Sequence, residues 1–386
     1  MFKRIICAVF CAATLFNVQA ADWSLSGSLN SSLEYDDNIF MRDTNKQGDY
    51  HATVSPSLKV AYETDDTEAS LSAGYIMDRY QASRYLDNND PFIKFNTAYT
   101  TQRASWGLGL SYAERSSRSD AADDTGDFET NSTSTNKSIS PSFSYQLTER
   151  DSLSLSTSYS EKTYSTTDFS GSKSRSISTH WQHQFTERLN GGISLSANNN
   201  KSAGLLTATD DDTYNVSMTS AYNLSEIWTI NGSVGRRQLD SRQTDIFGVT
   251  TEATNTGSSL SINASYQTDV DQASLSLSRS ISPSSTGDVN EQDKISMDWR
   301  RSLSETLTAG MSGSFQTTRS ALDTGSDERE NINLSPSINW AYSPDSTLSL
   351  SYNYRQQKES IVDTNVSSHT IMLTFNYDWH GINVSR

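Results

Sequence analysis

A strict alternation of apolar and small polar residues, interrupted by short polar turns, recurs along almost the whole chain. In residues 331–342, for example, Ile332, Leu334 and Ile338 occupy even positions, whereas asparagine and serine fill most odd positions. A period of two places successive side chains on opposite faces of a strand. One apolar face and one wettable face, repeated over many strands, is what a transmembrane β-barrel requires. The pattern therefore predicts an all-β chain, a single antiparallel barrel of about 18 strands that spans an outer membrane.

The composition agrees better with a barrel than with a soluble core or a disordered chain. Only 34% of the residues are hydrophobic and the mean hydropathy is −0.61, lower than a soluble domain of this length usually shows. Disorder is opposed by the regular spacing of the apolar residues and by 18 tyrosines, 13 phenylalanines and 7 tryptophans. A barrel needs little packed core, because lipid solvates its outer face and water its inner face.

The first residues have the features of a secretory signal peptide. Lys3 and Arg4 precede an apolar stretch that is too short to span a bilayer as a helix, and small residues mark a cleavage site after Ala20. We therefore expect a signal peptide over residues 1–20 and the barrel over residues 21–386.

Both cysteines of the chain fall within this signal peptide. Cys11 as a lipoprotein acylation site is the alternative, but bulky Phe10 stands where a small residue is expected. The mature chain then has no cysteine, so disulfides and thiolate metal sites are unavailable. It keeps 28 basic and 46 acidic residues, a net charge of −18.

The connections between the predicted strands alternate between two kinds. One set is short, as at residues 149–151 and 304–306, and the other is longer and mostly acidic, as at residues 36–48 and 241–255. Outer-membrane barrels have short periplasmic turns and longer extracellular loops, which assigns the two ends. All seven tryptophans fall near the predicted periplasmic ends, where an interfacial aromatic belt is expected; they are Trp23, Trp106, Trp181, Trp228, Trp299, Trp340 and Trp379.

The tripeptide Ser-Pro-Ser recurs inside three of the predicted strands, at residues 55–57, 140–142 and 335–337. Proline removes a hydrogen bond from the ladder and is normally confined to edges and bulges. A closed barrel has no edges, so we expect bulges at these positions.

No catalytic or metal-binding constellation is present in the sequence. The five histidines show no metal-ligand spacing, and there is no Gly-Xaa-Ser-Xaa-Gly, phosphate-binding or dinucleotide-binding motif. We therefore expect no enzyme activity, no catalytic residue, no cofactor and no metal. The acidic loops could bind divalent cations, but solvated surface loops are the favoured interpretation. So acidic a surface makes nucleic acid an unsuitable partner.

The predicted inner wall is dominated by serine, threonine, asparagine and glutamine. Its few inward charges are basic candidates, namely Lys59, Lys94, Arg115, Arg237 and Arg355. A porin selective for small ions usually carries rings of one charge, whereas hydroxyl and amide groups offer weak, evenly spread hydrogen bonds. A sugar polymer could slide along such a wall. Equally, serine could be there only because it is small and wettable.

The segment that follows the first predicted strand resembles a known family. Tyr35, Asp37, Asn38 and Phe40 within residues 34–40 are similar to the start of outer-membrane β-barrel porins associated with exopolysaccharide biosynthesis and secretion. The resemblance implies a passive outer-membrane conduit for an exopolysaccharide that acts with a periplasmic polysaccharide export protein. It also implies contact with lipopolysaccharide and with the barrel assembly machinery of a Gram-negative bacterium. The C-terminus departs from the usual pattern. Barrels commonly end in an aromatic residue, whereas here residues 380–386 follow the last aromatic residue.

Two other functions are compatible with the same barrel. One is a general or solute-selective diffusion porin, and the other is a structural or adhesive surface barrel whose acidic loops bind a partner. The sequence alone leaves all three open.

Overall fold

The computed structural model describes residues 21–118, 128–167, 169–204, 207–283, 289–322, 328–360 and 364–385. The predicted signal peptide lies outside the described residues. The strands are β1 (Asp22–Asp36), β2 (Asp49–Glu63), β3 (Thr67–Tyr80), β4 (Asn88–Thr100), β5 (Ala104–Ser116), β6 (Thr133–Gln146), β7 (Asp151–Tyr164), β8 (Gly171–Gln184), β9 (Leu189–Ala203), β10 (Thr207–Asn223), β11 (Trp228–Asp245), β12 (Thr250–Gln267), β13 (Asp271–Pro283), β14 (Val289–Ser302), β15 (Leu307–Ser320), β16 (Glu328–Ser343), β17 (Ser346–Glu359) and β18 (Thr364–Ser385).

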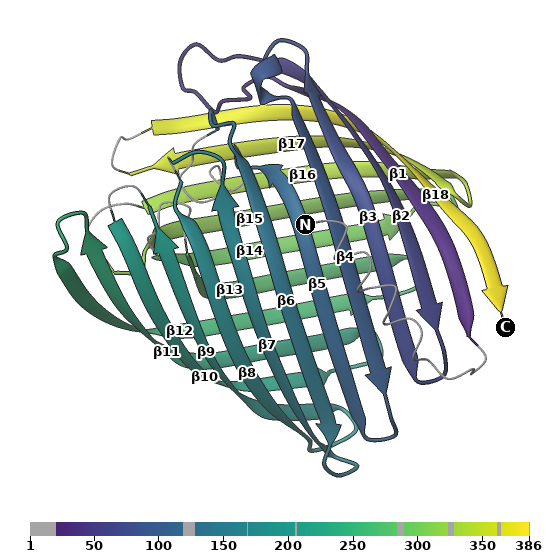
Figure 1. Cartoon of the computed structure of the whole chain (residues 1–386). Helices are drawn as coiled ribbons and strands as arrows, with labels where there is room; N and C mark the ends of the chain where they lie inside the picture. Colours follow the sequence, from purple (N-terminus) through teal and green to yellow (C-terminus); the bar gives the residue numbers. More distant parts are fainter. Residues whose placement is uncertain are drawn as a thin grey trace, which may run out of the picture.

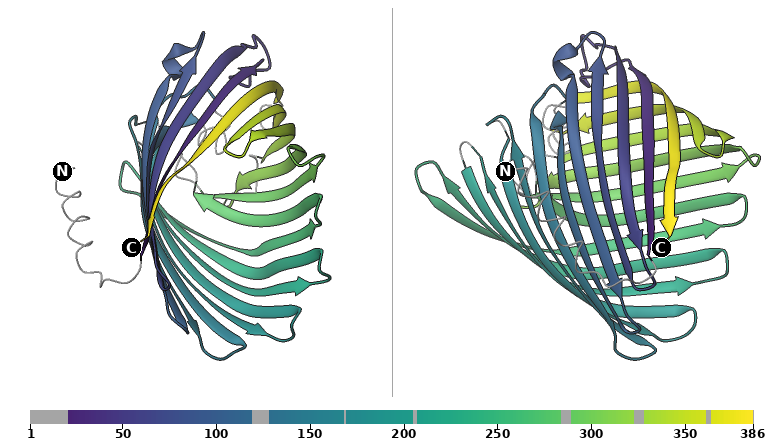
Figure 2. Two further views of the ribbon diagram at one scale, coloured as in Figure 1. Left: turned by 90° about the vertical axis from the view of Figure 1, so that its right-hand side faces the viewer. Right: turned by 45° about the vertical axis from the view of Figure 1, so that its right-hand side comes forward.

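These 18 strands form one closed antiparallel barrel, which confirms the predicted fold (Figures 1 and 2). Every strand pairs with its neighbours in sequence, and β1 closes the circle by pairing with β18 from Asp22↔Ser385 to Asp36↔Thr370. A 3-10 turn, η2 (Arg84–Leu86), lies between β3 and β4. In the described part of the chain, no helix is long and apolar enough to cross a membrane.

The alternation in sequence becomes the two faces of the wall. The outward face carries exposed apolar side chains such as Leu58, Ile338 and Leu373, which are 56%, 50% and 44% exposed. Across the inner face, serine hydroxyls hydrogen-bond between strands, for example Ser28 to Ser57 at 2.7 Å. A shift of one residue would turn every serine toward lipid, so the register is strongly specified.

The tryptophans lie at the end of the barrel that carries the short turns. Register places Trp23 beside Tyr62, Trp106 beside Tyr99, and further aromatic residues around the same rim. The rings of Trp23 and Tyr62 meet edge to face at 4.9 Å. This arrangement has the geometry of an aromatic belt at a membrane interface.

The expected bulges at the three Ser-Pro-Ser segments are wrong. Val54↔Met77 and Ser57↔Gly74 keep the same register on either side of Pro56, with no inserted residue between them. The other two prolines behave in the same way. On one side of each proline the ladder lacks the pairs at that position and then resumes in the same register. The neighbouring strand on the other side still pairs with the proline segment; Pro56, for instance, is in register with Leu29 on β1.

The long connections are shorter than the sequence predicts. Residues 241–255 were expected to form a loop, yet β11 continues to Asp245 and β12 begins at Thr250. A tight turn joins them, with Gly248 at φ +78°, a left-handed conformation that suits glycine. Asp245 accepts hydrogen bonds from the backbone of Phe247 and Val249 and so caps the turn. These strand ends are polar on both faces, which is why hydropathy did not reveal them.

Candidate functional site

The inner wall of the barrel is the candidate site, because it collects polar side chains from every strand around one lumen. Hydroxyl pairs such as Ser111–Ser138 and Ser156–Ser178 span neighbouring strands at 2.7 and 2.6 Å. Among the described residues, no group of three or more histidine, cysteine, aspartate or glutamate side chains could hold a metal ion. The wall can therefore offer hydrogen bonds and isolated charges to a passing solute.

Two of the predicted basic residues lie in one row across the wall. Lys59 on β2 is in register with Ser72 on β3, and Ser72 is in register with Lys94 on β4. Neither lysine has an ion-pair partner in the part of the chain that the structure describes. Both ammonium groups therefore remain available to an anionic solute.

Arg115 and Arg355 lie nearer the extracellular mouth. Arg115 is in the inward phase of β5, in register with Ser134. The Arg355 guanidinium stacks over the ring of Phe128 at 5.4 Å and donates to Asn333. These two arginines belong to the mouth, whereas Lys59 and Lys94 lie deeper in the wall, farther toward the short turns.

Arg237 differs from the other four predicted lumen residues. Its side chain is only 4% exposed and forms an ion pair with Glu291 of β14 instead of meeting open lumen. The inward phase of β11 places Arg237 as the sequence predicts, but another part of the wall covers it.

Residues 37–48 join β1 to β2 and lie over the mouth of the barrel. Contacts of Asp37 and Asn38, two residues of the motif described above, hold this segment in place. Asn38 is fully buried, donates to the carbonyl oxygens of Arg42 and Ser367 at 2.8 and 2.9 Å, and accepts from the Arg42 backbone at 3.0 Å. Asp37 accepts from the backbone of His369 on β18. We name residues 37–48 the mouth loop; its first residues tie it to β18, so the motif has a structural explanation.

The far side of the mouth loop is held by packing and by Arg118. Ile39 and Phe40 pack with Leu86, while Met41 packs with Phe128 and Val366. The Arg118 guanidinium donates to the carbonyl oxygen of Ile39, to that of Phe128 and to the Tyr80 hydroxyl.

The backbone of the mouth loop also shows a specific conformation. Met41 and Asn45 have φ values of +49° and +53°, a left-handed region that most residues avoid. Such strain persists only where the surrounding contacts fix the conformation, as the buried Met41 side chain does here.

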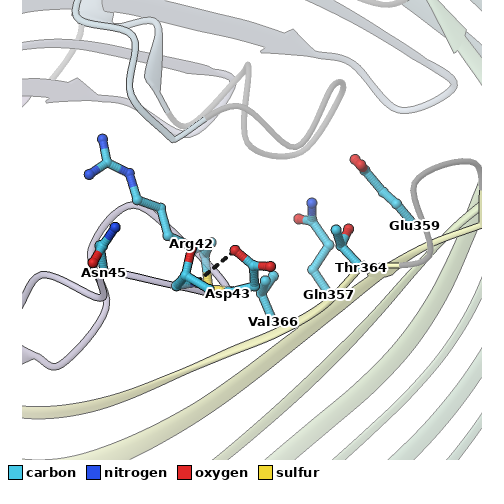
Figure 3. Close-up of a pocket in the computed structure, with 9 residues that line it drawn as sticks. Arg42, Asp43, Asn45, Gln357, Glu359, Thr364 and Val366 are labelled. Carbon is cyan, nitrogen blue, oxygen red and sulfur yellow. Dashed lines mark hydrogen bonds between the residues drawn. The ribbon is translucent and has the colours of Figure 1, made fainter.

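A hollow of about 390 Å³ lies between the mouth loop and the inner faces of β17 and β18 (Figure 3). Its lining includes Arg42 and Asp43 from the loop and Gln357 and Glu359 from β17. Arg42 also pairs with Glu129 at 2.7 Å, and this hydrogen bond raises the pKa of the Arg42 guanidinium above its usual value. A small polar molecule would meet donors and acceptors here before it reached the wall below.

Sequence reasoning missed the charged residues that accompany the mouth loop. His51 lies 3.0 Å from Asp78, and its ring stacks on Tyr80 at 4.2 Å between centroids. Glu34 is in register with His51. Period two places the side chains of Glu34, His51, Asp78 and Tyr80 on the inner face but does not show that they meet, whereas Arg118 follows β5 and gives no periodic signal.

Further hollows follow the inner wall toward the short-turn end. One of about 300 Å³ is lined by His180, Asn231 and Asn263, with several serine and glycine residues. Another, of about 250 Å³, is lined by Lys294, Asp298 and serines of β14 to β16. Their dimensions suit small solutes, and their lining consists mainly of small and polar residues.

Comparisons with known proteins support this class of architecture. The family model described as MetA-pathway of phenol degradation matches residues 12–175, less than half of the chain. No curated protein matches the chain by sequence.

Solved structures resemble it in fold. Pseudomonas aeruginosa OpdK with vanillate matches at a TM-score of 0.51 and 9% identity, over 92% of this chain and 99% of that one. Acinetobacter baumannii OccAB4 matches at 0.52 and 10%, over 95% and 99%. The ferric citrate transporter FecA matches at 0.54 and 13%; this chain covers 60% of its length and aligns over 86% of its own.

The fold is thus that of an outer-membrane β-barrel, and the chain is an outer-membrane protein of a Gram-negative bacterium. The expectation of exopolysaccharide export is contradicted. OpdK and OccAB4 are each matched over 99% of their length, OpdK was solved with the small molecule vanillate, and the matching family model concerns phenol degradation. Neutral hydroxyl-rich walls suit small solutes as well as polymers, so wall composition did not discriminate between these functions.

Proposed function

We propose that this protein is an outer-membrane diffusion channel for small solutes. The observation that carries the proposal is a closed barrel whose polar inner wall is partly covered at its mouth by a buried, hydrogen-bonded loop. Such a loop restricts the size of what passes, while the hydroxyl and amide groups of the wall replace part of a solute's hydration.

The charges along the wall favour anionic solutes. Lys59 and Lys94 flank Ser72 without counter-ions in the described residues, whereas Asp78 is engaged in hydrogen bonds with the His51 ring and the Thr53 hydroxyl. A carboxylate of modest size would be attracted to the lysine row more strongly than a cation of the same size.

The test is swelling of liposomes that contain the refolded protein, with neutral sugars of increasing size and with matched carboxylates. We expect uptake that falls steeply with solute size and is faster for a carboxylate than for an amine of equal volume. Heat-denatured protein at the same lipid ratio is the control. Swelling no faster than in these control liposomes, for the smallest sugar and the smallest carboxylate, would reject the proposal.

A further inference from the structure

The wall of the barrel is not continuous between β12 and β13. Their ladder runs from Gln267↔Gln272 to Leu260↔Arg279 and then stops. Above this point β12 continues along β11 as far as Thr250↔Thr244, and β13 continues along β14 to its end. The two strands therefore separate, and each stays with a different part of the wall.

Beyond the separation, the two parts overlap. Arg237 and Leu239 lie in the inward phase of β11, yet Arg237 pairs with Glu291 and Leu239 packs against Val289, both of β14. These β14 residues share the outward phase of Ile295, which is 47% exposed. An inward side chain of β11 reaches an outward side chain of β14 only where the end of β11 lies outside β14. We call this overlap the seam, formed by Arg237, Leu239, Val289 and Glu291.

Among the described residues, only side-chain contacts hold the seam together. Leu239 is fully buried, and Arg319 of β15 joins Arg237 on Glu291. Gly257 provides the space for the Arg237 guanidinium, because a Cβ there would lie 2.8 Å from its Nη2 atom. Two further nitrogens of Arg237 are buried without a hydrogen-bond partner. A contact without a backbone ladder and with unsatisfied donors is a place where a wall opens locally.

A hollow of about 280 Å³ lies at the foot of the seam, where the last pair of the ladder forms. Its apolar lining comes from Leu260, Leu277, Ile295 and Phe315, all in the outward phase of their strands. The hollow also reaches Lys294, which is in the inward phase and lines the lumen hollow next to it. Lys294 is thus common to a lipid-side hollow and a lumen hollow.

From this arrangement we propose that the seam is a lateral portal between the lumen and the outer leaflet, used by small amphipathic carboxylates. The four apolar side chains would contact the ring or short chain of the solute. Lys294, which has no ion-pair partner among the described residues, would hold its carboxylate, since Arg279 is occupied by Asp293 at 2.5 Å. That the portal opens into a conducting lumen rests on the proposed channel function, whereas the binding hollow itself does not depend on that function.

The transport test closes the seam with a disulfide. The variant L239C/V289C joins its two layers, and the mature chain contains no other cysteine. The variant M218C/V234C, which bridges the intact β10–β11 ladder, is the matched control. We expect oxidation of the seam pair to slow uptake of benzophenone-4-carboxylate at least tenfold, to leave uptake of a neutral pentose unchanged, and to be reversed by a reductant. Equal carboxylate uptake by the reduced and the oxidised form of this variant would overturn the proposal of a lateral portal.

A second measurement works even if the barrel conducts nothing. Illumination of protein with benzophenone-4-carboxylate should label peptides that contain Leu260, Ile295 or Phe315, and Lys294→Gln should reduce that labelling at least fivefold. Labelling of other peptides only, or labelling that Lys294→Gln does not reduce, would refute the proposed binding hollow. Absence of pentose uptake by the wild type would reject the diffusion channel alone, because photolabelling decides the portal independently.

Discussion

Releasing the mouth loop by a single substitution should measure how firmly it is held. Asn38→Ala removes three hydrogen bonds, two donated by the side-chain amide and one accepted from Arg42. At about 1 kcal/mol net for each bond, the closed loop loses about 3 kcal/mol, which is roughly a hundredfold increase in the opening equilibrium. Asn38→Asp keeps the volume but turns a carboxylate oxygen toward two carbonyl oxygens, so it should release the loop at least as much.

Trypsin cleavage after Arg42 and Lys46 reports the opening of the mouth loop, provided that reclosing is faster than cleavage. We expect cleavage within the loop to accelerate by about two orders of magnitude in Asn38→Ala, in line with the energy above. Thr44→Ala, which truncates an exposed side chain of the same loop, should leave the cleavage rate unchanged. An Asn38→Ala cleavage rate within threefold of wild type would refute the assignment of the loop's stability to this side chain.

Three more predictions concern the wall. Gly74→Ala should destabilise the barrel by about 1–3 kcal/mol in urea unfolding, since the new Cβ would lie 2.7 Å from the Pro56 carbonyl oxygen and collide with Phe92; unchanged stability would show that the backbone yields there. Pro56→Ala should raise the unfolding free energy by about 0.5–1.5 kcal/mol by restoring an N–H to the ladder, and a loss of stability would contradict that reasoning. Lys94→Glu should abolish the preference for anions in bilayer reversal-potential measurements, because the new carboxylate cancels the charge of Lys59, and an unaltered anion-to-cation ratio would show that the row of Lys59 and Lys94 does not determine selectivity.

The sequence predicted the barrel because every membrane strand repeats one physical rule. Alternation placed Leu58 outward and Ser57 inward without knowledge of any neighbour, and the strand number followed from the repeats. The strand ends nearest the mouth, such as Thr250–Ser258, are polar on both faces and gave no periodic signal.

The candidate site was less predictable because it depends on contacts between distant segments. Asn38 reaches Ser367 across 329 positions of the chain, and Arg118 reaches Ile39 from the other side. Period two correctly assigned Arg237 to the inner phase of β11, yet it could not show that the strand end lies outside β14. Burial by overlap is a property of the whole wall, not of one strand.

Closure by β1 and β18 makes completion of the chain a condition for completion of the wall. Asp22 and Ser385 are partners from opposite ends of the described barrel, so the last ladder forms only after every other strand exists. Until then both edges present unpaired N–H and C=O groups, which readily pair with another chain. A polypeptide cut short before β18 would keep the β1 edge free permanently, and that edge is a ready signal by which proteases and chaperones distinguish an incomplete product from a finished one.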